Sequence, residues 1–231
     1  MEESLLVQME TLTAKSVVTE TEAMIQEHPD DWILREQYAL FLALGGQIDA
    51  AIDQWQHITQ QLPHYPRGFV QLGGLLHRAG RWNEAVPVLR RALELHPINV
   101  KAMHDLAVCL SNQEVYDEAF ELFANAVRIM PNYPEAHVDW ALVLASRGQS
   151  LEAARRFQEA LNHAPDHLGA HYHLGRHFAK AEDYEPAEKH HLEVVRLAPA
   201  DVDARMDLAL LYLKQKKVAE GVEQLQHAVD L

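Results

Sequence analysis

Apolar residues between positions 66 and 99 recur in two helical patterns. The first set is spaced by three and four residues, as on one face of a helix, and consists of Phe69, Leu72, Leu75, Leu76 and Ala79. Gly80 is expected to end this helix. A second set, from Ala85 to Leu95, predicts another helix that stops before Pro97, because proline cannot continue a helix. The stretch is therefore predicted to form a helical hairpin.

The proline that closes this hairpin belongs to a series with a fixed spacing. The series is Pro29, Pro63, Pro97, Pro131, Pro165 and Pro199, and its members are 34 residues apart. A period of this length predicts an array of helical units, each of which buries its apolar face against its neighbours. We expect an N-terminal capping segment at residues 1–31 and six repeats, at residues 32–65, 66–99, 100–133, 134–167, 168–201 and 202–231.

The order of residues within a repeat resembles that of the tetratricopeptide repeat. The matching positions in one copy are Phe69, Leu72-Gly73, Leu76, Ala85, Leu89, Ala92 and Pro97, and later copies keep the order. The resemblance implies an all-α fold, a right-handed α-solenoid of antiparallel helix pairs. It also implies a non-enzymatic scaffold or adaptor that binds a peptide or an amphipathic helix of a partner protein in a concave groove, which the first helices line.

Candidate groove residues follow when the groove positions of that family are carried over to this chain. They are Arg67, Val70, Gly74, His77, Arg78, His104, Asp105, Val108, Val138, Asp139, Leu142, Tyr172, His173, Arg176 and Lys180. The apolar members favour a partner with apolar anchors, but the same residues could instead pack against neighbouring helices. The chaperone-tail clamp of the family is not matched, because Glu36 and Leu40 replace its lysine and asparagine.

Two features of this set indicate ligands of different charge. Family members that bind extended peptides carry an asparagine ladder where this chain has Asp105 and Asp139, and these carboxylates favour a basic or amide-rich segment. Gly74, in contrast, is expected to leave a notch beside Arg67, His77 and Arg78. A carboxylate or a phosphate of the partner, or a bulky side chain beside one, would dock in that notch.

Charge and composition narrow the class of partner. The formal net charge of the 231 residues is -14, which argues against nucleic acid, whose phosphates bind clustered lysine and arginine. The single cysteine, Cys109, excludes an internal disulfide and fits a reducing compartment. The sequence has no signal-peptide pattern and no run of about 18 apolar residues. We therefore expect a cytoplasmic protein without membrane insertion.

The chain contains 15 histidines, which are candidates for a metal site or a catalytic site. We expect most of them at helix positions open to solvent, and a zinc site needs three or four convergent ligands. The sequence contains no nucleophile motif and no phosphate-binding loop. We therefore predict no catalytic residue, no metal site and no cofactor.

Two alternatives to the adaptor stay open. The acidic N-terminal end and the apolar residues Val222, Leu225 and Val229 of the last repeat could meet head to tail in a homo-oligomeric, self-assembling scaffold. The chain could also be the repeat portion of a longer enzyme.

Overall fold

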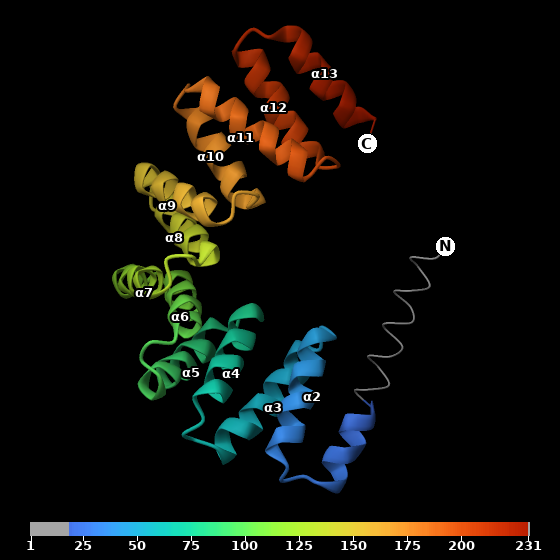
Figure 1. The fold of residues 1–231 in the computed structure, drawn as a ribbon, viewed down its shortest axis with the longest axis vertical. Helices are drawn as coiled ribbons and strands as arrows, with labels where there is room; N and C mark the ends of the chain where they lie inside the picture. Colours follow the sequence, from blue (N-terminus) through green and yellow to red (C-terminus); the bar gives the residue numbers. More distant parts are fainter. Residues whose placement is uncertain (1–18, 231) are drawn as a thin grey trace. The chain divides into compact units, whose positions relative to one another are not determined.

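The computed structural model describes residues 19–230, which form helices joined by short turns and contain no strand (Figure 1). The first helices of the repeats are α2 (Trp32–Leu44), α4 (Pro66–Arg78), α6 (Val100–Asn112), α8 (Pro134–Ser146), α10 (Leu168–Lys180) and α12 (Val202–Lys214). The second helices are α3 (Ile48–Gln61), α5 (Trp82–Leu95), α7 (Tyr116–Ile129), α9 (Ser150–His163), α11 (Tyr184–Leu197) and α13 (Val218–Val229). Of the predicted capping segment, residues 1–18 lie outside the described chain and residues 19–27 are helical.

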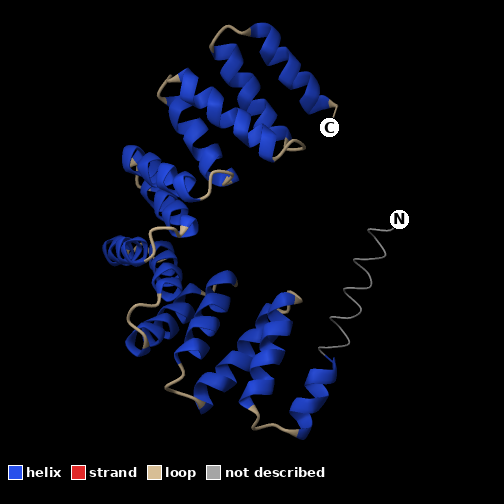
Figure 2. Cartoon of the chain, in the orientation of Figure 1, coloured by secondary structure: helices blue, strands red, loops and turns tan. Residues whose placement is uncertain are grey.

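The described chain divides into two compact units within α7, between Asn125 and Ala126. We call them the N-terminal unit and the C-terminal unit. In each unit the two helices of a repeat pack side by side, and the second helix also packs against the first helix of the next repeat (Figure 2). Thus α3 contacts both α2 and α4, and α9 contacts both α8 and α10. The predicted all-α solenoid of helix pairs is confirmed.

Helix starts and ends follow local rules that recur with the period. Asp31, Asn99 and Asp201 accept hydrogen bonds from backbone N–H groups in the first turns of α2, α6 and α12. Pro66 and Pro134 occupy the first positions of α4 and α8, where the N–H that proline lacks would have no partner within the helix. The sequence therefore fixes where each first helix begins.

The turn inside each pair requires one residue with a positive φ. The six residues at this position are Gly46, Gly80, Glu114, Gly148, Glu182 and Lys216. The next residue closes the turn with a hydrogen bond to a carbonyl in the last helical turn, as from Gln47 N–H to Leu42 O at 2.8 Å. Three of the six repeats thus hold a side chain in a backbone conformation that favours glycine.

Small residues occupy the places where the paired helices come closest. In the first helices these are Ala39, Gly73, Ala107, Ala141, Gly175 and Ala209. At Gly73 an added Cβ would lie 2.4 Å from Leu89 Cδ2, which is far inside van der Waals contact. The core combines aliphatic side chains with buried aromatic ones such as Trp55 and Phe123. None of the helices in the described range is long and apolar enough to cross a membrane.

The turn geometry predicts opposite effects for two substitutions. Gly148→Ala should lower the free energy of unfolding by about 1 kcal/mol, because a Cβ is disfavoured at this positive φ. Nothing lies within 4 Å of the added Cβ, so the substitution causes no steric clash and its effect comes from the backbone conformation alone. Glu182→Gly should raise the free energy of unfolding, because φ there is also positive. Urea unfolding followed by circular dichroism measures both, and shifts of the same sign would contradict this account.

Candidate functional site

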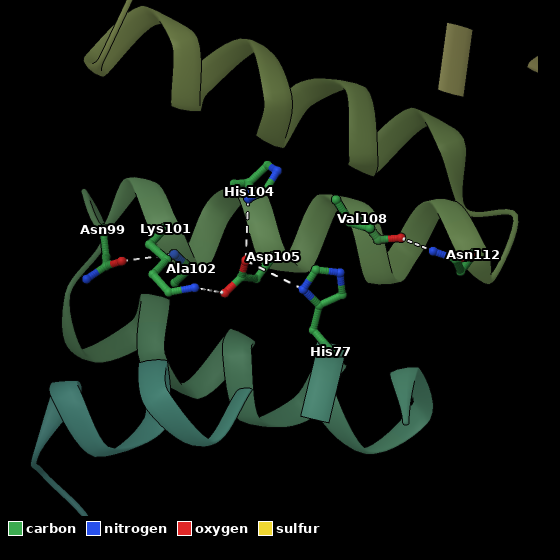
Figure 3. Close-up of polar contacts among 8 residues, drawn as sticks. All are labelled: His77, Asn99, Lys101, Ala102, His104, Asp105, Val108 and Asn112. Atoms are coloured by element: carbon green, nitrogen blue, oxygen red, sulfur yellow. Dashed lines mark hydrogen bonds and ion pairs between the residues drawn. The ribbon is translucent and has the colours of Figure 1, made fainter. Parts of the chain in front are cut away.

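In the N-terminal unit, the groove position at Asp105 is occupied by a buried ionic cluster (Figure 3). Lys101 Nζ lies 2.8 Å from Asp105 Oδ2, and the Nδ1 atoms of His104 and His77 lie 3.4 Å and 3.7 Å from Oδ1. Burial alone would raise the pKa of the Asp105 carboxyl, but hydrogen bonds from His104 and His77 and the charge of Lys101 outweigh it. They hold this pKa well below its usual range. Asp105 therefore joins α4 to α6 as a carboxylate.

This cluster corrects two expectations. Asp105 is only 3% exposed and its oxygens are already engaged, so it does not present acceptors to a partner. The predicted notch beside Gly74 is filled as well. A Cβ at Gly74 would lie 3.1 Å from Asp105 Oδ2 and 3.2 Å from Lys101 Nζ. The expectation of an open anion site failed because the sequence pattern does not show which side chains of the next repeat fill the space beside a glycine.

The other predicted residues of this unit are also more engaged than we expected. Arg67, assigned to an incoming anion, pairs with the buried carboxylate of Glu36 at 3.1 Å. Val70 and His104 are buried, and Val108 is half-buried, so the apolar row is not an exposed strip here. Arg78, at the end of α4, is exposed. In this unit, packing against neighbouring helices explains more of the predicted groove than an open binding surface does.

The N-terminal unit also has a hollow, of about 420 Å³, whose lining includes Arg67, Val70 and Lys101. The C-terminal unit contains a hollow of about 490 Å³ between its helices. Its apolar side includes Phe157 of α9 and Leu210 and Leu211 of α12. Its polar side is formed mainly by His173, Arg176, His177 and Lys180 of α10, and by Asp207 and Lys214 of α12. Within each first helix these residues recur at steps of three and four, so one face of α10 and one face of α12 line the same space. We call this space the C-terminal hollow.

Aromatic contacts fix the residues on the α10 side of the hollow. The ring of His173 stacks on Phe157 with 4.9 Å between centroids and 7° between planes. Arg176 Nη1 donates a hydrogen bond to Tyr172 Oη at 2.8 Å, and its guanidinium lies 5.4 Å from the centre of that ring. Burial lowers the pKa of His173, and the nearby charge of Arg176 acts in the same direction. The hollow thus combines a positioned guanidinium with an imidazole that favours its neutral form.

His191 of α11 also lines the hollow. It is only 2% exposed, and its Nδ1 has no hydrogen-bond partner among residues 19–230. Gly175 makes room for it, because a Cβ there would lie 3.1 Å from the imidazole. Burial lowers the pKa of His191, Asp207 raises it and Arg176 lowers it. A buried ring nitrogen without a hydrogen-bond partner costs free energy, and solvent does not reach this atom.

A second buried histidine pair lies between α10 and α11. His171 Nδ1 and His190 Nδ1 are 2.9 Å apart, and His171 Nε2 lies 2.8 Å from the Pro165 carbonyl oxygen. The carbonyl can only accept, so in the neutral pair His171 donates from Nε2 and His190 donates from Nδ1. Arg35 and Arg205, at the equivalent repeat position, also bond to the carbonyl of the proline six residues earlier. The pair is a structural contact.

We expected most of the 15 histidines at positions open to solvent. Five of them, His104, His137, His171, His190 and His191, are buried, and the other ten are half-buried or exposed. In the part of the chain that the structure describes, no group of three or more His, Cys, Asp or Glu residues is arranged to hold a metal ion.

The structure brings some of the predicted groove residues together. His173, Arg176 and Lys180 line the C-terminal hollow, and Tyr172 holds Arg176 from behind. The three predicted residues of α8 are not among those that line it: Val138 is buried, Asp139 is half-buried and Leu142 is 37% exposed.

The groove residues predicted from the sequence did not include several residues that line the hollow, namely Phe157, His177, His191, Leu210 and Lys214. Two of these residues could have been predicted from the 34-residue period, since Lys214 follows Lys180 by 34 residues and Leu210 follows Arg176 by the same interval. The part played by second-helix residues such as Phe157 and His191 is visible only in the packed structure.

Family models decide what these repeats are. Two models of the tetratricopeptide repeat match the chain, one over residues 76–137 and the other over residues 138–201 and 180–231. Together they span more than half of the sequence. The chain belongs to the tetratricopeptide repeat family.

Known tetratricopeptide repeat structures share the fold with this chain at low sequence identity. A chain of the APC/C hetero-tetramer Cut9–Hcn1 superposes with a TM-score of 0.73 at 14% identity, over 94% of this chain and 43% of that one. YrrB, a TPR protein with an unusual peptide-binding site, gives a TM-score of 0.62 at 19% identity, over 76% of this chain and 91% of that one. At these identities the likeness establishes the fold.

Among curated proteins, Protein O-mannosyl-transferase Tmtc3 of Drosophila melanogaster is 24% identical over 141 residues. The matched part is 61% of this chain and 15% of the transferase. This tetratricopeptide repeat chain thus spans less than a fifth of the length of that relative.

The His171–His190 pair predicts how stability depends on pH. Burial, together with the charge of a protonated His171, lowers the pKa of His190 from 6.5 to about 4. Between these values the unfolded chain binds the proton and the folded chain does not, so stability falls as pH falls. Moving from about pH 7 to about pH 5 should therefore lower the free energy of unfolding by on the order of 2 kcal/mol through this residue.

Urea unfolding at both pH values measures this loss for the native chain and for His190→Gln. Glutamine can keep a hydrogen bond to His171 but does not titrate, so the variant should lose less stability on acidification. An equal loss in both proteins would show that His190 does not carry the effect.

Proposed function

We propose that this chain is a non-catalytic, protein-binding repeat module that holds a segment of a partner protein in the C-terminal hollow. The observation that carries the proposal is the composition of that hollow. Exposed Leu210 offers an apolar floor, and polar side chains of α10 and α12 border it. A concave site of about 490 Å³ with few convergent polar groups is typical of binding sites, which commonly measure about 300–1,000 Å³.

The distribution of titratable groups supports a binding role over a catalytic one. The most buried of them, Asp105, His171 and His190, are engaged with neighbouring helices or with each other. The groups that border the hollow are held by stacking and by a phenol, as for His173 and Arg176. Preorganised side chains of this kind reduce the entropy lost when a partner binds.

The family adds support of a coarser kind. Tetratricopeptide repeat chains bind protein partners in general, and YrrB is a member with a peptide-binding site. The transferase relative is far longer than this chain, and we propose no activity from it. The other proposal for this chain, self-association, draws on α13, where Val222 and Val229 are 56% and 80% exposed.

A pair of matched variants tests the hollow as the binding site. Leu210→Asp places a charge on its apolar floor, and should reduce capture of partner proteins from native lysate by at least about tenfold, which corresponds to about 1.4 kcal/mol. Leu192→Asp is the control, because Leu192 of α11 is similarly exposed, 45% against 54% for Leu210, and does not line the hollow.

Quantitative mass spectrometry of the captured proteins, with circular dichroism to verify equal helicity, provides the comparison. Proteins that the native chain and Leu192→Asp both retain should be lost from Leu210→Asp. Equal retention by the two variants would contradict the proposal.

A further inference from the structure

We propose that the C-terminal hollow selects a short acidic peptide segment, whose carboxylates meet Arg176, Lys180 and Lys214 while a neighbouring apolar side chain lies on Leu210. This inference rests on the proposed function and adds the chemistry of the partner. The net charge of the whole chain, -14, by itself disfavours an acidic ligand. Binding of an acidic segment therefore depends on the positive charge around the hollow.

The three cations that border the hollow lack ion-pair partners. Among residues 19–230, no carboxylate forms an ion pair with Arg176, Lys180 or Lys214. Some other cations of the same unit are paired, as for Arg155 with Glu152 at 3.4 Å and Lys217 with Glu188 at 2.7 Å, whereas Lys189 and Lys216 form no ion pair among residues 19–230. Positive charge that the fold leaves unpaired around one concave space favours an anionic ligand there.

The cations come from two successive repeats and face the same space. Lys180 follows Arg176 by four residues on α10, so both side chains lie on one face of that helix. Lys214 of α12 is the equivalent of Lys180 one repeat later. Arg176 is already positioned by the Tyr172 hydroxyl at 2.8 Å. The arrangement suits several carboxylates spread along a segment better than one isolated anion.

Asp207 also lines the hollow, and its carboxylate can accept a hydrogen bond from a peptide N–H of the ligand. This group is suited to peptide backbone, which a simple anion lacks.

The size and surroundings of the hollow favour a short peptide over a nucleic acid. Its volume of about 490 Å³ accommodates a few side chains. Nucleic-acid affinity comes from many phosphate contacts made by clustered cations, and a chain of net charge -14 opposes a long polyanion. The exposed Leu210 also provides apolar surface that a phosphate backbone would leave unused.

A phage-displayed library of random decapeptides, selected on the immobilised full-length chain, tests this inference. The selected peptides should be enriched in Asp and Glu next to an aromatic or aliphatic residue. Their affinity should fall by at least about tenfold in Lys180→Glu/Lys214→Glu and should weaken as salt is raised. Both lysines are exposed, so the fold should tolerate the change.

Arg155→Glu/Lys189→Glu is the matched control, since it changes the net charge equally at exposed positions of second helices that do not line the hollow. It should bind the selected peptides as the native chain does. Selected peptides without acidic residues, or equal weakening by both double variants, would overturn the inference. Neutral peptides that still lose affinity in Leu210→Asp would overturn it while leaving the proposed function in place.

Discussion

The structure depends on the close approach of paired helices at small residues. A Cβ at Gly73 would lie 2.4 Å from Leu89, and one at Gly221 would lie 3.1 Å from Leu213. Helices that approach this closely bury large side chains completely, and Trp55, Leu89 and Leu208 have no measurable exposure. Because each second helix also contacts the next first helix, the same constraint is passed along each unit. The close packing of the pair determines which face of every first helix points away from its second helix.

The two units use that outward face differently. In the N-terminal unit the chain satisfies its own charges, since Glu36 pairs with Arg67 and Asp105 is held by Lys101 and two imidazoles. Removing one partner of such a cluster would leave a buried charge without compensation, which costs free energy. The intact cluster therefore stabilises the packing between repeats. In the C-terminal unit the corresponding positions of α10 and α12 border a hollow, and its cations have no carboxylate partner in the described chain. This difference in charge pairing is the physical reason for assigning binding to the C-terminal unit.

Much of the fold could be predicted from the sequence, because it depends on local chemistry repeated at a fixed spacing. The prolines set the period, and caps such as Asp31 and turn residues such as Gly80 set the helix ends. The site was less predictable. Groove positions can be counted from the period, yet whether a side chain there is exposed depends on its neighbour in the next repeat, as Asp105 beside Gly74 shows. Residues from second helices, such as His191, enter the hollow only through three-dimensional packing.

The most direct test of the central claim is a crystal structure of the full chain with a peptide selected from the random decapeptide library. The account predicts that the peptide lies in the C-terminal hollow, with an apolar side chain against Leu210 and a carboxylate in contact with Lys180 or Lys214. A peptide bound to the N-terminal unit, or to the outer surface of the second helices, would contradict it.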